Sequence, residues 1–149
     1  MPEAMLFETG KWEIRSPDRV AHLADALKTA RRLSGGSDLV GGGRTKAFHL
    51  VIRGHADARP IAGFSNLRLS QLRARALEEA LLSNKISAPN FHVSAQGVGE
   101  SEPVTDNCES GRSKAQAPRS ACPDGKYASD SELVRNRRIE LRFGFFTGN

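Results

Sequence analysis

The sequence predicts an α/β fold in which helices pack on one face of a small sheet. Short runs with an apolar residue at every second position alternate along the chain with longer runs in which apolar residues recur every three or four positions. The first spacing is typical of strands and the second of amphipathic helices. Strands that alternate with helices favour a helical layer on a sheet. The length of 149 residues suits one domain, which we expect to span 1–149.

The first third of the chain predicts a strand, a helix and a loop. Met5-Leu6-Phe7 is a short apolar run that ends at a turn. Ser16-Pro17-Asp18 is a typical helix start, because it offers a capping hydroxyl, a proline for the first turn and an acid near the positive end of the dipole. Arg31 and Arg32 close that helix. Five glycines between Ser34 and Gly43 then predict a flexible loop near 34–45, without the Lys-Ser/Thr ending of a phosphate-binding loop.

The remaining elements follow the same alternation. Ala47 to Arg53 predicts a strand with Phe48, Leu50 and Ile52 on one face, and Leu69 to Ser83 predicts a second amphipathic helix. Phe91, Val93 and Ala95 predict the next strand, a short helix is expected near Ser131 to Asn136, and the last strand carries Ile139, Leu141, Phe143 and Phe145.

Two cysteines, Cys108 and Cys122, lie in a long polar stretch between Gly97 and Asp130. One interpretation is a disulfide that closes a loop of about fifteen residues, which stabilises a fold by roughly 3 kcal/mol and indicates an oxidising compartment. The alternative is a pair of free cytosolic thiols. We favour the disulfide, because exposed thiols in a polar segment would be a liability.

The charge and the termini limit the function classes only loosely. A net charge of +5 favours anionic partners such as nucleic acid, acidic lipid or cell-wall polymer. The chain lacks both an apolar run of about eighteen residues and the pattern of a secretory signal. If the protein works outside the cytoplasm, we therefore expect that a signal peptide or membrane helix precedes this sequence.

One stretch carries the most specific pattern, GHADARPIAGFSNLRLSQLRA over 54–74. It resembles the OmpA-like peptidoglycan-binding family in Gly54, His55 and Asp57, followed by Asn66, Leu69, Ser70, Arg73 and Ala74. Further family-like pieces follow the same order along the chain: Leu6-Phe7-Glu8, Gly97-Val98-Gly99-Glu100 with Pro103, and Asn136-Arg137-Arg138-Ile139-Glu140. The resemblance covers most of the chain from Leu6 to Phe143. It implies a β-α-β-α-β sandwich with helices on a small mixed sheet, and a non-catalytic, periplasmic wall-binding module without a cofactor.

A finer pattern, Asp57-x-x-Pro60-Ile61 with Phe64-Ser65-Asn66, is most similar to the periplasmic domains of proton-channel stator B subunits. That resemblance implies a preceding membrane helix, a membrane partner subunit and a homodimer. The protein would then anchor a membrane complex to the cell wall.

The resemblance also implies a binding site for the diaminopimelate of the peptidoglycan stem peptide. This group carries both an ammonium and a carboxylate. Asp57 would accept from the ammonium, and the planar fork of Arg73 would bind the carboxylate bidentately. The two side chains must then face one cleft. Asn66 would act mainly as a helix N-cap that shapes the site, and Phe7, Glu8 and Thr9 match a family position near the stem peptide, with Glu8 where aspartate is common.

Other features depart from the family or have an ordinary explanation. Ala56 replaces the usual threonine, and an insertion near 104–130 carries the cysteines; it could cover the site, recruit a partner or decorate the surface. Arg137 and Arg138 are expected to steady the loop beneath the site. On composition alone, Asp57 and Arg73 would be a loop residue and a solvated helix residue.

Two other functions are less consistent with the sequence. His55-x-Asp57 could form a metal-binding or base pair, but the histidines at 22, 49, 55 and 92 offer no second cluster at metal-ligand spacing, and no nucleophile has a partnered base. Basic runs such as Arg31-Arg32 suggest nucleic-acid binding, but Trp12 and Tyr127 lie outside them. We therefore expect neither catalysis nor a nucleic-acid partner.

Overall fold

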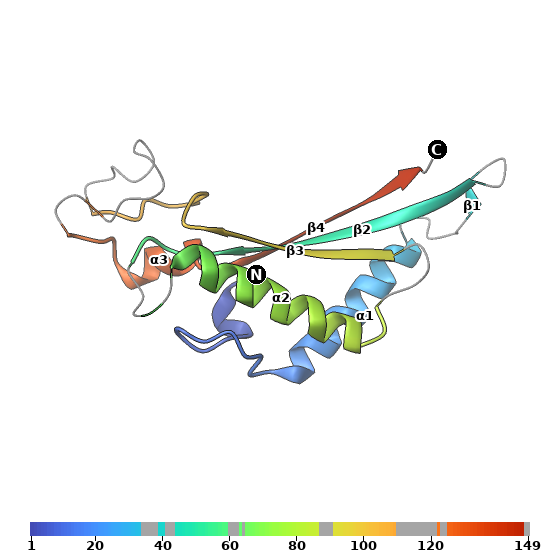
Figure 1. Cartoon of the computed structure of the whole chain (residues 1–149), viewed down its shortest axis with the longest axis horizontal. Coiled ribbons are helices and arrows are strands. Elements are labelled where there is room, and N and C mark those ends of the chain that lie inside the picture. Colours follow the sequence, from blue (N-terminus) through green and yellow to red (C-terminus); the bar gives the residue numbers. More distant parts are fainter. Residues whose placement is uncertain are drawn as a thin grey trace.

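A computed structural model describes residues 1–33, 39–40, 44–59, 63, 65–86, 91–109, 122 and 125–147. Its elements are a 3-10 turn η1 (Glu3–Met5), helices α1 (Pro17–Leu33), α2 (Asn66–Ser83) and α3 (Asp130–Asn136), and strands β1 (Leu39–Val40), β2 (Arg44–His55), β3 (Phe91–Gly99) and β4 (Ile139–Thr147). Figure 1 shows these elements along the sheet.

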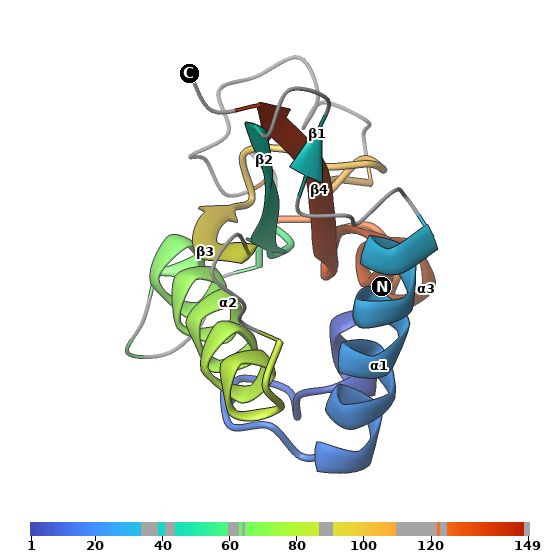
Figure 2. The same cartoon turned by 90° about the vertical axis from the view of Figure 1, so that its right-hand side faces the viewer.

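The sheet is mixed, with β2 at its centre. β3 runs parallel to β2 on one side, β4 runs antiparallel to it on the other, and the two residues of β1 pair with the beginning of β2. Both long helices, α1 and α2, lie on the same side of this sheet (Figure 2). The predicted α/β class, with helices packed on a small mixed sheet, is confirmed.

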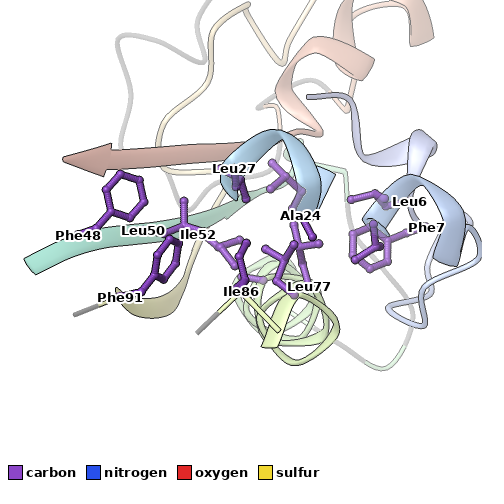
Figure 3. Close-up of a cluster of buried hydrophobic side chains, with 14 residues drawn as sticks. Leu6, Phe7, Ala24, Leu27, Phe48, Leu50, Ile52, Leu77, Ile86 and Phe91 are labelled. Atoms are coloured by element: carbon purple, nitrogen blue, oxygen red, sulfur yellow. The ribbon is translucent and has the colours of Figure 1, made fainter. Parts of the chain in front are cut away.

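The core lies between that face of the sheet and the two helices (Figure 3). Phe48, Leu50 and Ile52 of β2 are essentially inaccessible to solvent, as their alternation predicts. Leu77 and Leu81 of α2 are equally buried. The alternation in β2 and the apolar stripe of α2 therefore identify their buried faces correctly, whereas Phe143, an alternating apolar residue of β4, is 51% exposed.

The predicted first strand at 5–7 is wrong. Glu3–Met5 instead form the turn η1, and the amides of Leu6 and Phe7 both donate to the carbonyl oxygen of Glu3. These local bonds use the N–H groups that a strand would offer to a neighbour. Leu6 and Phe7 are still buried in the core. The apolar run therefore predicts burial correctly, but the backbone there forms a turn and not a strand.

Several boundaries also differ from the prediction. β2 extends beyond 47–53 at both ends. The N-cap of α2 is Ser65, whose hydroxyl accepts from the Arg68 amide, and Asn66 is the first residue of the helix; the prediction that Asn66 is the cap was wrong. Within the predicted glycine-rich loop, residues 39–40 form β1, and 34–38 and 41–43 lie outside the described residues.

The second helix lies unusually close to the sheet near its N-terminal end. A Cβ atom at Gly54 of β2 would come within 2.2 Å of the Ser70 carbonyl oxygen, and one at Gly97 of β3 within 2.4 Å of the Gln71 amide nitrogen. Glycine at both positions therefore allows α2 to pack with its backbone against the strand ends. Among the described residues, no helix has the length and apolar character needed to cross a membrane.

Candidate functional site

A cavity of about 370 Å³ opens where the N-terminal segment, the end of β2 and the beginning of α2 meet. Its lining residues come from distant parts of the chain: Glu3, Thr9, Gly10, Ala56, Asp57, Arg59, Asn66, Leu69, Arg73 and Arg137. Asp57 and Arg73 thus share one cavity, as the proposed site requires.

Asp57 follows the end of β2 by two residues and is only 5% exposed. Its carboxylate accepts from the Arg59 amide at 2.9 Å, from the Arg59 guanidinium at 2.9–3.3 Å, and from Nη1 of Arg137 at 2.7 Å. Arg59 is itself about one-third exposed and also bonds the exposed Asp130 at 2.5 Å. Two arginines therefore hold this carboxylate.

Arg73 is buried on the inner side of α2, 2% exposed. Its Nε donates to the Lys11 carbonyl at 2.8 Å and its Nη2 to the Glu8 carbonyl at 3.2 Å. The Phe7 ring lies beneath it, with its centroid 5.5 Å from the guanidinium carbon. These contacts fix the plane of the guanidinium.

Glu3, like Arg59, is a cavity residue that sequence reasoning missed. Its carboxylate bonds Nη1 of Arg73 directly and lies 3.5 Å from Nε of Arg137, so it bridges two arginines of the cavity. Burial raises the pKa of Glu3, and the opposing effect of Arg73 is smaller. No local pattern marks this acid, because its partners lie 70 and more residues away in the sequence.

The other predicted site residues divide into two groups. Thr9 and Asn66 line the cavity, and Asn66 donates its amide to the Arg59 carbonyl at 3.1 Å. Phe7 is a core residue that supports Arg73. The Glu8 side chain is exposed and pairs with Lys11 at 2.8 Å, so that Glu8 contributes to the site through its carbonyl.

The cavity has more positive than negative charge. Three of its lining residues are arginines (59, 73 and 137) and two are acids (Glu3 and Asp57). A guanidinium has five N–H donors, and Arg73 uses three of them on described partners. Asp57, in contrast, already has both oxygens occupied. The arrangement therefore favours a ligand that brings carboxylate oxygens.

A second charged cluster lies at the end of β2, just before Asp57 in the chain. Arg53 forms a two-point pair with Glu102 at 2.6 and 2.9 Å, and Arg138 pairs with Glu140 at 2.8 Å. His55, 2% exposed, lies 3.4 Å from Glu140. Burial and the neighbouring Arg138 lower the pKa of His55 to about 4, although Glu140 opposes them. These ion pairs join β2 and the start of β4 to Glu102, which follows β3, while Arg137 contacts Asp57 itself.

The predicted disulfide between Cys108 and Cys122 is present, with both residues buried. Parts of the insertion at 110–121 and 123–124 lie outside the described residues, as do Pro60, Ile61 and Phe64 of the stator-like pattern. Within the described part of the chain, no group of three or more His, Cys, Asp or Glu side chains is placed to hold a metal ion.

Structural comparison finds similar folds among periplasmic and wall-associated proteins. The periplasmic domain of Helicobacter pylori MotB is 19% identical with a TM-score of 0.64, and the match covers 96% of this chain and 72% of that one. The cell wall anchor of the T6SS from Pseudomonas aeruginosa is 27% identical with a TM-score of 0.63, covering 97% and 78%. The peptidoglycan-associated lipoprotein from Burkholderia pseudomallei is 18% identical with a TM-score of 0.56, covering 93% and 87%.

Sequence comparison agrees with the fold. Outer membrane protein A of Serratia odorifera is 32% identical over 93 residues, 62% of this chain, and the match spans about a third (32%) of that relative's length. The family model described as the OmpA family matches residues 6–116. Because this match covers well over half of the sequence, the chain belongs to the OmpA family.

Proposed function

We propose that this protein binds peptidoglycan non-covalently and without catalysis, through the diaminopimelate of the stem peptide, and thereby anchors a membrane protein or complex to the cell wall. The observation that carries the proposal is the shared cavity, in which a buried acid and a buried, rigidly held arginine lie among further arginines. Relatives whose names describe a cell wall anchor and a peptidoglycan-associated lipoprotein support it.

Arg73 is the proposed carboxylate-binding group. Two carbonyls and Glu3 hold its guanidinium in place, so little conformational entropy remains to be lost when a ligand binds. Two of its five N–H groups have no partner among the described residues, and Arg137 has further donors nearby. A planar fork of this kind matches a carboxylate better than a lysine ammonium does.

Asp57 is the proposed acceptor for the ligand ammonium. Its oxygens are occupied by Arg59 and Arg137, so an incoming ammonium has to displace one of them. Arg59 is the group that can leave, because its side chain is about one-third exposed and its second partner, Asp130, is almost fully exposed. In this proposal Arg59 occupies the ammonium position until the ligand arrives.

The resemblance to stator proteins makes a periplasmic location, a homodimer and a partner subunit in the membrane part of the same proposal. The similar MotB domain is described as periplasmic. No nucleic-acid partner and no cofactor are needed for the proposed activity.

The first test is co-sedimentation with diaminopimelate-type sacculi, together with the dissociation constant for a soluble diaminopimelate-containing muropeptide. Asp57→Asn and Arg73→Lys should each weaken binding by about tenfold to a hundredfold, because each removes a charge-assisted hydrogen-bonding group worth roughly 1.5–3 kcal/mol. Arg73→Lys keeps a positive charge beside the buried Glu3. Arg73→Ala would leave this buried acid without its partner and would destabilise the fold more.

Control variants are available at exposed positions of the two long helices. Arg75→Lys, two residues further along α2 on an exposed position, and Asp18→Asn at the exposed start of α1 should leave binding unchanged. A lysine-type muropeptide should bind more weakly than the diaminopimelate type, because it lacks the carboxylate for Arg73. Wild-type affinity in both site variants, with both folded, would place the wall-binding site elsewhere, and binding of a DNA duplex in preference to sacculi would favour the nucleic-acid alternative.

A further inference from the structure

We infer that Asn107 is a positioning residue for the loop that carries Asp57 and Ala58, and that the Cys108–Cys122 disulfide helps to hold this loop in place through Asn107. This inference rests on the proposed function, since it assigns a role in that site to the insertion that departs from the family pattern. Asn107 does not line the cavity, but its side chain is 2% exposed and directly contacts the backbone next to Asp57.

The backbone amides on either side of Asp57 each donate a hydrogen bond to another part of the chain. The His55 amide donates to the Arg138 carbonyl and the Ala56 amide to the Gly99 carbonyl, both at 2.9 Å. After Asp57, the Ala58 amide donates to Oδ1 of Asn107 at 3.2 Å. The first two contacts continue the sheet, and the third comes from the insertion.

Asn107 is itself fixed from two sides. Its Oδ1 also accepts from Nδ2 of Asn136 at 2.8 Å, at the end of α3. Its carbonyl oxygen accepts from the Ala128 amide at 2.9 Å and lies 3.6 Å from Sγ of Cys122. The neighbouring Cys108 pairs with Tyr127 as an isolated antiparallel bridge. The disulfide thus covalently joins Cys108, the residue next to Asn107, to Cys122, which precedes Tyr127 by five residues in the chain.

A continuous series of contacts therefore connects the disulfide to the residue that follows Asp57. Each connection from Cys122 through Asn107 to Ala58 is a contact between buried groups. If the disulfide is opened, Asn107 keeps its bonds to Asn136 and Ala128 but loses the covalent restraint on its neighbour. We therefore expect reduction to loosen Ala58, and with it Asp57, without unfolding the sheet.

The first experiment needs no ligand. Amide hydrogen exchange of Ala58 is measured by NMR in the oxidised protein, after reduction, and in Asn107→Ala. In the reduction, dithiothreitol supplies two electrons and two protons, the S–S bond opens to two thiols, and the reagent becomes a cyclic disulfide. In both cases protection of Ala58 should fall at least severalfold more than that of the Ala56 amide, which bonds to Gly99.

The second experiment measures muropeptide affinity in the four combinations of wild type or Asn107→Ala, oxidised or reduced. Asn107→Ala should weaken binding about tenfold, and reduction should weaken wild type about threefold and the variant not at all. Such non-additivity is expected if both changes act along one chain of contacts. A merely structural role would lower affinity by the same factor in both backgrounds, and reoxidation should restore the wild-type value.

The outcomes separate this inference from the proposed function. Unchanged exchange of Ala58 on reduction and in Asn107→Ala overturns the inference, whether or not the protein binds the wall. Equal, additive losses of affinity overturn it as well, even if Asp57 and Arg73 prove essential. If oxidised wild type fails to bind any muropeptide, the proposed function fails and the assignment of Asn107 to wall binding fails with it, while the exchange data still report the contact itself.

Discussion

At the scale of single residues, His55 shows how the fold tunes a side chain beside the site. Its ring is buried next to two arginines, and the only acid within 4 Å of it among the described residues is Glu140 at 3.4 Å. Burial favours the neutral ring, and its pKa falls from 6.5 to about 4. His55 is thus neutral at physiological pH, as suits a residue that braces the strand end preceding Asp57.

The depressed pKa of His55 predicts a loss of stability in mild acid. Between pH 6.5 and about 4 the unfolded chain binds a proton at this position that the folded protein does not, so the free energy of unfolding should fall as the pH falls through that range. The full effect corresponds to roughly 3 kcal/mol. Denaturant unfolding at pH 7, 5.5 and 4 should therefore show a shallower decline in His55→Gln than in wild type.

His22 provides the matched control for that measurement. It is exposed on α1, so His22→Gln should keep the wild-type decline. Parallel pH profiles for wild type and His55→Gln would mean that His55 is protonated as readily in the folded state as in the unfolded one.

The sequence identifies only some of the residues that line the cavity. Asp57, Arg73, Asn66 and Thr9 follow from the family-like pattern, and all four line the cavity. The pairing of Arg73 with Glu3 does not follow from it, because an ion pair between distant positions depends on the tertiary structure. For the same reason the sequence shows that residue 57 is an acid, but not that two arginines bind its carboxylate.

At the scale of elements, the site depends on how closely α2 approaches the sheet. The first turns of α2 carry Asn66, Leu69 and Arg73 into the cavity. Gly54 and Gly97 lie beneath the same part of the helix, where any added Cβ would meet helix backbone. Because backbone cannot be moved aside as a side chain can, an added methyl group has to displace the helix or the strand.

Gly97→Ala should therefore destabilise the protein by about 1–3 kcal/mol or more and weaken wall binding together with stability. Chemical denaturation and the muropeptide affinity of the folded fraction are the two measurements. Gly144→Ala is the control, because a Cβ there has no described atom within 4 Å. If Gly97→Ala equals Gly144→Ala in both measurements, the close approach of α2 to β3 does not position Arg73.

Element type was easier to predict than element ends. The apolar stripes of α1 and α2 and the alternation in β2 and β3 gave the correct elements, because burial of one face selects these spacings. The residues at 5–7 misled the prediction, since two adjacent buried side chains suit a turn as well as a strand. At the start of α2, Ser65 and Asn66 are both good caps, and only the observed bond to Arg68 decides between them.

At the scale of the whole molecule, the central place of β2 could not be obtained from periodicity. Alternating apolar residues mark a strand but do not specify its neighbours or their direction, so the mixed sheet was expected only through the family resemblance. The insertion was located by its length and its cysteines, whereas its role was left open. The contacts of Asn107 now connect it to the loop that carries Asp57.

The disulfide between Cys108 and Cys122 also contributes to global stability. Cys108 and Cys122 are 14 positions apart, and in the chain-entropy model closing a loop of this length stabilises the fold by roughly 3 kcal/mol. The double variant Cys108→Ser/Cys122→Ser should lose about that much free energy of unfolding, and reduced wild type should lose a similar amount. Because the sheet, α1 and α2 form the main core without the insertion, both should remain folded at 25 °C with an unchanged far-UV circular dichroism spectrum. Complete unfolding of either form would show that the insertion is part of the cooperative core. An unchanged free energy of unfolding in both would show instead that the insertion opens independently of the sheet, and the contact from Asn107 to Ala58 would then have to survive without the covalent restraint.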